Sequence, residues 1–261
     1  MAEEEIPLAG GMGSGGAVVR VGDTVRRPWR AHSPAVHALL AHLAAQGFDG
    51  APRFLGADDR GREILTYLDG EVGLPPFASW TAADDLLVSV ADLQRRMHAA
   101  ARSFVPPADA RWDRANLPGA GLGDIVCHND LCVENVVVRG GRAAGFIDFD
   151  FAAPNDPLVD IAIAARHWIP FRAPQDLDPG RAGVDQVARF RLFGDAHGLT
   201  ADQRARVVSA GLDFLDRALV SMRLRAERGE PAYVTVWEQG YPAQNRRSFD
   251  WLTAHAAHLT T

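Results

Sequence analysis

The chain of 261 residues contains no lysine, so all 27 of its basic residues are arginines. Any site that commonly uses a lysine ammonium must therefore use a guanidinium group, which is planar, bidentate and always charged. Cysteine is also scarce, because Cys127 and Cys132 are the only two. Two cysteines are too few for a disulfide framework. We interpret both as buried apolar thiols.

Two other uses of these cysteines are weaker alternatives. A zinc site made of both thiolates and His128 would lack a second pair of ligands. A thiol enzyme would need Cys127 and His128 to exchange a proton, but adjacent residues on a strand point apart.

The sequence also lacks long apolar runs and a positive balance of charge. No apolar run approaches the roughly 20 residues that cross a bilayer. The acidic start, Met1 to Glu5, has no basic region of the kind that opens a secretory signal. A formal net charge of -6 gives no support for nucleic-acid binding. We therefore expect a cytoplasmic protein with neither a nucleic-acid nor a membrane partner.

The most informative stretch runs from His128 to Asn135 and reads H-x-D-L-x-x-x-N, with D-F-D following at 148–150. Phosphoryl transfer to a hydroxyl needs one carboxylate to accept the hydroxyl proton. It also needs an amide oxygen and a second carboxylate to hold the metal ion. Asp130 fits the first role, and Asn135 and Asp148 fit the second.

The spacing between the two motifs is compatible with a hairpin. A β-branched run at 136–138 and an apolar run at 143–147 flank Gly140 and Gly141, which can adopt the positive φ values of a two-residue turn. Such a hairpin would bring Asn135 and Asp148 side by side, where a Mg²⁺ ion could bind between them. The alternative is an ordinary polar turn followed by a strand end.

The N-terminal part reads as short strands around one helix. A turn joins strands at 17–21 and 24–27, a helix follows at 33–46, and a second hairpin uses 52–56 and 62–67. The glycine-rich segment 10–16 precedes the first strand. Its backbone N–H groups could bind phosphates, and the candidate nucleotide-binding residues are Gly11, Gly13, Ser14 and Gly15. No G-K-[ST] follows, so this is not a P-loop; a plain linker is the alternative.

A kinase of this layout places a cation on the strand that follows the glycine loop. The candidates are Arg26 and Arg27, and alternation along a strand lets only one of them face the cleft. We favour Arg26. The alternative is a solvated basic edge strand.

The remainder is mostly helical. The residues at 81–84 and at 200–203 resemble capping boxes that open two helices, the second of which should end near Glu227. Further helices are predicted at 158–169 and 248–259, with a proline-rich loop at 171–183. The fold class is therefore α+β.

The chain resembles the aminoglycoside phosphotransferase family, within the wider kinase-like fold that includes choline kinases. The resemblance covers nearly the whole length and is most specific at 127–135 and 147–162. It implies a bilobal protein-kinase-like fold. Residues 1–68 would form a small β-rich nucleotide-binding lobe that ends at the hinge, and 69–261 a larger, mostly helical catalytic and substrate-binding lobe.

The same resemblance implies ATP and Mg²⁺ as cofactors, with Asp130 as catalytic base and Asn135 and Asp148 as metal ligands. Adenine would lie at the hinge near Thr66, Tyr67 and Leu68, and Asp160 would brace the catalytic loop.

Three features depart from the family pattern. The usual H-G-D is H-N-D at 128–130, and the phosphate-binding lysine is replaced by arginine. The helix at 33–46 has no glutamate to pair with that cation and contains His37 and His42 instead.

The predicted function is transfer of the ATP γ-phosphoryl group to a hydroxyl of a small molecule, by default an aminoglycoside or related antibiotic. The alternatives are a kinase of another metabolite or peptide hydroxyl, and a nucleotide-binding pseudokinase without turnover. The larger lobe carries many acids, which would attract a cationic acceptor. The alternative is that these acids lie on solvated helix faces. They are Asp150, Asp156, Asp176, Asp178, Asp213 and Glu238. The pairs His255/His258 and Asp176/Asp178 are interpreted as surface features rather than metal sites.

Overall fold

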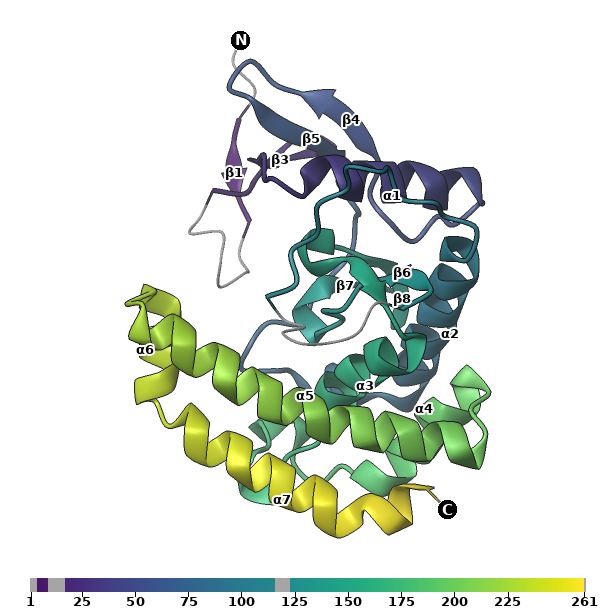
Figure 1. The fold of residues 1–261 in the computed structure, drawn as a ribbon, viewed down its shortest axis with the longest axis vertical. Helices are drawn as coiled ribbons and strands as arrows, with labels where there is room; N and C mark the ends of the chain where they lie inside the picture. Colours follow the sequence, from purple (N-terminus) through teal and green to yellow (C-terminus); the bar gives the residue numbers. More distant parts are fainter. Residues whose placement is uncertain (1–3, 9–16, 116–122, 261) are drawn as a thin grey trace.

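The N-terminal part of the molecule is a twisted sheet covered by one helix (Figure 1). This is a computed structural model, and it describes residues 4–8, 17–115 and 123–260. Within these residues, the first strands form one five-stranded antiparallel sheet in the order β1-β2-β3-β5-β4. The strands are β1 (Ile6–Pro7), β2 (Val19–Val21), β3 (Thr24–Pro28), β4 (Phe54–Ala57) and β5 (Arg62–Thr66).

Helix α1 (Ser33–Ala45) forms where the sequence predicts it. Pro34 lies in its first turn, where the missing N–H costs nothing. Val36, Leu39, Leu40 and Leu43 are buried along one stripe. The chain leaves the helix at Gly47, whose φ of +76° suits glycine.

The rest of the chain is mostly helical and holds two small two-stranded sheets, β6 with β9 and β7 with β8. Figure 1 shows the long helices α5 and α7 running side by side at the far end from the N-terminal sheet. The elements are α2 (Asp84–Ala101), β6 (Ile125–Cys127), β7 (Val136–Arg139), β8 (Arg142–Phe146), β9 (Ala153–Asn155), α3 (Pro157–Trp168), α4 (Gln186–His197), α5 (Ala201–Glu227), α6 (Pro231–Glu238) and α7 (Tyr241–Thr260).

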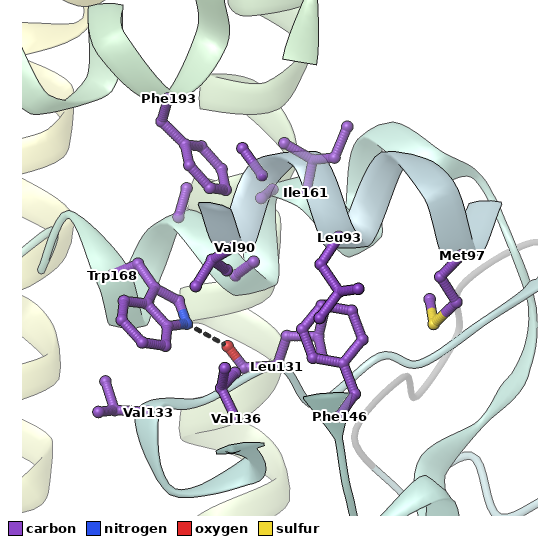
Figure 2. Packing of buried hydrophobic residues seen from close by; sticks show 14 of the residues in the cluster. Val90, Leu93, Met97, Leu131, Val133, Val136, Phe146, Ile161, Trp168 and Phe193 are labelled. Carbon is purple, nitrogen blue, oxygen red and sulfur yellow. Dashed lines mark hydrogen bonds between the residues drawn. The ribbon is translucent and has the colours of Figure 1, made fainter. Parts of the chain in front are cut away.

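The hydrophobic core runs beneath the predicted catalytic loop. Figure 2 shows the indole of Trp168 in α3 directed at Leu131, with Val90 and Leu93 of α2 packed next to them. Trp168 and Leu131 are fully buried. The Trp168 indole Nε1 donates a hydrogen bond to the Leu131 carbonyl oxygen at 3.1 Å. The loop is therefore fixed to α3 by burial and by a directional bond.

The structure corrects several element predictions. The capping box at 81–84 is wrong: Thr81 lies in a 3₁₀ turn (Ser79–Ala82), its hydroxyl donates to the Ala78 carbonyl, and α2 begins only at Asp84. Helices α4 and α6 were not predicted, and α7 begins at Tyr241 rather than at 248. The capping box at Thr200 is confirmed, as is the end of α5 at Glu227.

Among the described helices, none is long and apolar enough to cross a membrane. The division of the chain at residue 68 stays a prediction, although β5 ends at Thr66 close to it.

Candidate active site

The loop after β6 is shaped by a left-handed residue. Asn129 has a φ of +63°, a conformation that glycine accepts freely and asparagine tolerates. Its side-chain amide donates to the carbonyls of Cys127, Phe151 and Ala153 at 3.1–3.2 Å, and its amide oxygen accepts from Asn155 at 2.8 Å. The H-N-D sequence therefore places asparagine at a backbone conformation that glycine also adopts, and the asparagine adds a network of hydrogen bonds.

Asp160 of α3 braces this loop, as predicted. One of its carboxylate oxygens accepts from the backbone N–H of Asn129 at 2.6 Å, and the other from Gln94 at 2.8 Å and His98 at 2.7 Å. Burial alone would raise the pKa of Asp160, but the His98 and Gln94 contacts outweigh it and the pKa is lowered. Asp160 is thus a buried carboxylate whose charge is balanced by hydrogen bonds.

His98, Cys127 and Asp160 lie close enough to hold a metal ion. However, both carboxylate oxygens of Asp160 are already used. Burial raises the pKa of the Cys127 thiol well above its ordinary value, which disfavours the thiolate that a metal needs. The cluster is better explained as the support of the catalytic loop, and both cysteines are free.

Asp130 and Asn135 face each other across the loop. The Asn135 side-chain N–H₂ donates to the Asp130 carboxylate at 3.0 Å and to its backbone carbonyl at 2.8 Å. This use of the nitrogen leaves the amide oxygen available as a metal ligand. Burial and the charge of Asp148 raise the pKa of Asp130 well above its ordinary value. A raised pKa improves a carboxylate as a proton acceptor.

The predicted hairpin between the two motifs is confirmed. Strands β7 and β8 pair antiparallel around Gly140 and Gly141, whose φ values are +57° and +74°. The N–H of Ile147 donates to the carbonyl of Asn135 at 2.9 Å. Asn135 and the residue before Asp148 are therefore hydrogen-bonded neighbours. Burial and the charge of Asp150 raise the pKa of Asp148, while Arg27 opposes the shift.

The prediction that Arg26 faces this site is wrong, because Arg27 does. Arg27 contacts Asp148 at 3.4 Å through Nη1 and pairs with Asp150 through Nη2. Arg26 hydrogen-bonds to Thr24 and lines a separate surface cavity with Glu5 and other residues. The two arginines do lie on opposite faces of β3. However, the alternation of side chains along a strand does not show which face is directed at the active site.

Glu63 of β5 supplies the acid that α1 lacks. It lies directly opposite Arg27 in the sheet, and its carboxylate is 2.6 Å from the Arg27 Nε. It also accepts from Ser33 at 3.3 Å and pairs with His37, both on α1. Glu63 is 1% exposed. Burial would raise its pKa, but His37 and Arg27 outweigh burial and the pKa is lowered.

Glu63 was not predicted, because the acid that pairs with the phosphate-binding cation was expected on the helix at 33–46. An acidic residue on the strand that pairs with β3 could have indicated this partner of Arg27, since opposite charges directly across a sheet attract.

The candidate hinge follows β5. The backbone N–H of Tyr67 donates to Asp23 at 2.9 Å, and the Arg20 guanidinium lies 3.9 Å from the centre of the Tyr67 ring. Thr66 accepts a hydrogen bond from the Arg53 N–H at 2.8 Å, and Leu68 lies against Gly145. Adenine binding here stays a prediction. Gly11, Gly13, Ser14 and Gly15 lie outside the described residues.

The remaining sequence candidates are structural. The ring of His255 stacks on Trp251 and its Nδ1 bonds to the Trp251 carbonyl, while the His258 ring lies 6.4 Å from it. The Asp176 carboxylate accepts two hydrogen bonds from Arg247 at 2.6 and 2.7 Å. Neither pair resembles a metal site.

A small cavity between α1 and the second hairpin is lined by Arg27, Glu63, Asp148 and Phe149 among others. Arg27 and Asp148 thus meet at this cavity, and the hydrogen bond between Ile147 and Asn135 joins it to the loop that carries Asp130. The donor set consists of oxygen ligands, which Mg²⁺ prefers, and a guanidinium, which binds phosphate. The residues therefore fit a magnesium–nucleotide complex.

Proteins of similar sequence support a phosphotransferase site. Residues 109–193 match the model of the phosphotransferase enzyme family. The chain is 30% identical to the trifolitoxin immunity protein of Rhizobium leguminosarum bv. trifolii, over 98% of this chain and 97% of that one. It is 31% identical to a homoserine kinase of Nitrobacter winogradskyi over 75% of this chain, and spans 53% of that protein's length.

Two solved structures share the fold. A choline/ethanolamine kinase family protein from Mesorhizobium loti matches with a TM-score of 0.63 and 18% identity, covering 98% of this chain and 92% of that one. An aminoglycoside phosphotransferase from Streptomyces rimosus matches with a TM-score of 0.51 and 18% identity, covering 80% and 92%. The architecture is therefore the bilobal, protein-kinase-like α+β fold predicted from the sequence.

The motif geometry, the family match and the full-length relative together show that the chain belongs to the phosphotransferase enzyme family, whose members act on hydroxyl acceptors.

Proposed function

We propose that this protein transfers the γ-phosphoryl group of ATP to a hydroxyl group of a small molecule, with Mg²⁺ as the metal ion. The proposal rests on the backbone hydrogen bond between Ile147 and Asn135 at the end of the hairpin. This bond holds the segment before Asp148 against the catalytic loop that contains Asp130.

Each residue has a separate task in this proposal. Asp130 accepts the proton of the attacking hydroxyl, and the Asn135 amide holds its carboxylate in position. Asn135 and Asp148 would hold Mg²⁺, which neutralises charge on the phosphates when bound. Glu63 anchors the Nε atom of Arg27, and phosphate oxygens would compete with Asp148 and Asp150 for its two terminal nitrogens.

The acceptor that the comparisons support is an antibiotic or toxin. The relative that matches over nearly the whole length is named as an immunity protein. Phosphorylation of a hydroxyl on the toxic molecule is one way in which a phosphotransferase could confer such immunity or antibiotic resistance. A metabolite hydroxyl is the second candidate, because the partial relatives are homoserine kinases.

The structure weakens one argument for a cationic acceptor. Asp150 pairs with Arg27, Asp156 with Arg206 and Asp176 with Arg247, and the Asp178 carboxylate lies 3.9 Å from Arg172. Asp150, Asp156 and Asp176 are therefore engaged by arginines of the same chain, which leaves fewer of the six acids to attract a cationic acceptor.

The pseudokinase alternative also weakens. Its basis was the missing acid of α1, and Glu63 supplies that acid from β5. The cation of the nucleotide site is therefore positioned, although by a different element.

The test is a panel of hydroxyl compounds that includes aminoglycosides, hydroxyl-containing peptide toxins and homoserine, each incubated with radiolabelled ATP and Mg²⁺. The proposal predicts a labelled product with at least one acceptor, and none without Mg²⁺. Tight binding of Mg²⁺–ATP with neither transfer nor hydrolysis would favour the pseudokinase.

A further inference from the structure

Three arginines gather at the C-terminal end of α3, beside the catalytic loop. Arg166 lies in the last turn of α3, Arg172 follows the helix, and Arg181 lies in a short 3₁₀ turn (Pro179–Arg181). The hydrogen bond from Trp168 to Leu131 fixes this end of α3 against the loop that carries Asp130. The end of α3 that carries Arg166 therefore adjoins the loop that carries the catalytic carboxylate.

The backbone that carries these arginines is held rigidly. The Gln186 side chain donates to the carbonyl of Arg172 at 2.9 Å and also to that of Pro170. The Arg181 guanidinium donates to the carbonyl of His167, at the end of α3, and is 3% exposed. Arg181 is thus explained as a cap of the helix. The Arg166 guanidinium lies 5.6 Å from the centre of the Phe214 ring, a contact that leaves its N–H donors without a carboxylate.

The positive charge of this cluster is incompletely balanced. Within the described residues, no carboxylate lies within 4 Å of the Arg166 guanidinium, whose nearest polar contact is the His167 ring at 3.3 Å. Arg172 reaches only Asp178, at 3.9 Å. By contrast, the buried Arg189 pairs with Asp84 at 2.8 Å and also donates hydrogen bonds to the carbonyls of Ala82 and Trp168.

Burial and the mutual repulsion of the cations both disfavour the charged forms in this cluster. Burial and the charge of Arg166 lower the pKa of Arg172. Burial, Arg189 and Arg172 lower the pKa of Arg181 to about 10. The His167 pKa is lowered well below its ordinary value by burial and by all three arginines. The acids that face the cluster, Asp176, Asp178 and Glu134, do not cancel these effects. A partly buried cation without a partner is costly, so the site favours an anion.

We propose that Arg166 and Arg172 form an anion-binding subsite for the phosphate acceptor, so that the acceptor carries a carboxylate or similar oxyanion in addition to its reactive hydroxyl. The guanidinium fork matches the geometry of such a group. The hydrogen bond from Trp168 to Leu131 joins the end of α3 that carries Arg166 to the loop that carries Asp130. This inference rests on the function proposed above, because it assigns the group that the same site recognises.

The test compares 4-hydroxybutyrate with 4-hydroxybutyramide, which has the same hydroxyl and no charge. Both are titrated into the protein in the presence of Mg²⁺ and a non-hydrolysable ATP analogue. Binding is followed by the side-chain Nε–Hε NMR signals of Arg166 and Arg172, assigned by their absence in Arg166→Gln and Arg172→Gln. The acid should shift both signals and bind at least about tenfold more tightly than the amide, because bonds to charged groups are the stronger ones.

Each subsite variant should weaken binding of the acid by about tenfold or more and leave the amide unaffected. Arg246→Gln is the matched control, since Arg246 is an exposed arginine of α7 paired with Asp250 at 3.1 Å. Equal binding of acid and amide, no binding of either, or full affinity in both subsite variants would overturn the inference.

Failure of this inference differs from failure of the proposed function. If the Mg²⁺–ATP analogue itself does not bind, the proposed function is wrong. If the analogue binds and Mg²⁺–ATP is hydrolysed, but the acid is not preferred, only the anion subsite is wrong.

Discussion

At the scale of single residues, two left-handed residues shape the site. Asn129 and Asp148 have φ values of +63° and +60°. Such a conformation costs a residue with a Cβ atom roughly 1–2 kcal/mol, and less for Asn and Asp, whose short side chains bond locally. Asn129 offsets the cost through its bonds to Cys127, Phe151 and Ala153.

Asn129→Gly and Asn129→Ala form a matched pair that separates these effects. Both lose the side-chain hydrogen bonds, but only Ala also meets the cost of positive φ. We expect Ala to lower the free energy of unfolding by about 1 kcal/mol more than Gly. Urea unfolding of both variants measures the difference; equal stabilities would show that backbone conformation at 129 is unimportant.

Arg27 and Arg26 provide a second matched pair. Arg27→Ala should raise the KM for ATP by about tenfold or more, because a charged hydrogen-bond donor to phosphate is lost. Arg26→Ala should remain near wild type, since Arg26 lies on the other face of β3. Steady-state kinetics decide between them, and an effect confined to Arg26 would reverse our assignment.

The motif residues could be predicted because their chemistry depends on spacing along the chain. Asp130, Asn135 and Asp148 belong to one loop and one hairpin, so local sequence brings them together. Arg27 could not be chosen over Arg26, since the two faces of β3 differ only in what the rest of the fold places against them. Glu63 was hidden for the same reason, because its role depends on strand pairing.

At the scale of elements, the sequence predicted correctly those turns and caps whose geometry depends on neighbouring residues alone. It did not predict elements that depend on the rest of the fold. The glycine turn at 140–141 and the capping box at Thr200 were found because each carries its own geometry. The box at Thr81 failed because the threonine bonds backwards to Ala78 instead of forward into a helix. Helix α6 has no buried residues, so it lacks the apolar stripe by which helices are recognised.

Thr200→Ala tests the confirmed capping box. The Thr200 hydroxyl accepts from the Gln203 N–H at 3.3 Å, and the Gln203 side chain accepts from the Thr200 N–H at 2.9 Å. Removing the hydroxyl should lower the free energy of unfolding by about 1 kcal/mol. Chemical denaturation measures this, and phosphotransfer should be unchanged because the helix start lies away from Asp130. An unchanged stability would indicate that the cap contributes nothing.

At the scale of the whole molecule, Asp160 connects α2, α3 and the catalytic loop through Gln94, His98 and Asn129. Its pKa is lowered from the ordinary value of 3.8. A lowered folded-state pKa means that the charged form stabilises the fold above the unfolded-state pKa, and that this stabilisation is lost as pH falls through the folded-state pKa.

The difference in free energy of unfolding between wild type and Asp160→Asn should therefore be constant at neutral pH and shrink below about pH 4. Denaturant titrations across this range measure it, and the other carboxylates cancel in the comparison. A difference that grows as pH falls would mean that the Asp160 carboxylate is not stabilised by its partners.

The central claim is that Asp130 accepts the proton of the acceptor hydroxyl while a neighbouring metal site holds the nucleotide. The most direct measurement is the rate of phosphoryl transfer by Asp130→Asn, with binding of the Mg²⁺–ATP complex determined calorimetrically on the same preparation. We predict a fall of roughly 10²–10⁴-fold in kcat with nucleotide binding retained. A variant that transfers phosphate within a few-fold of the wild-type rate would contradict the account.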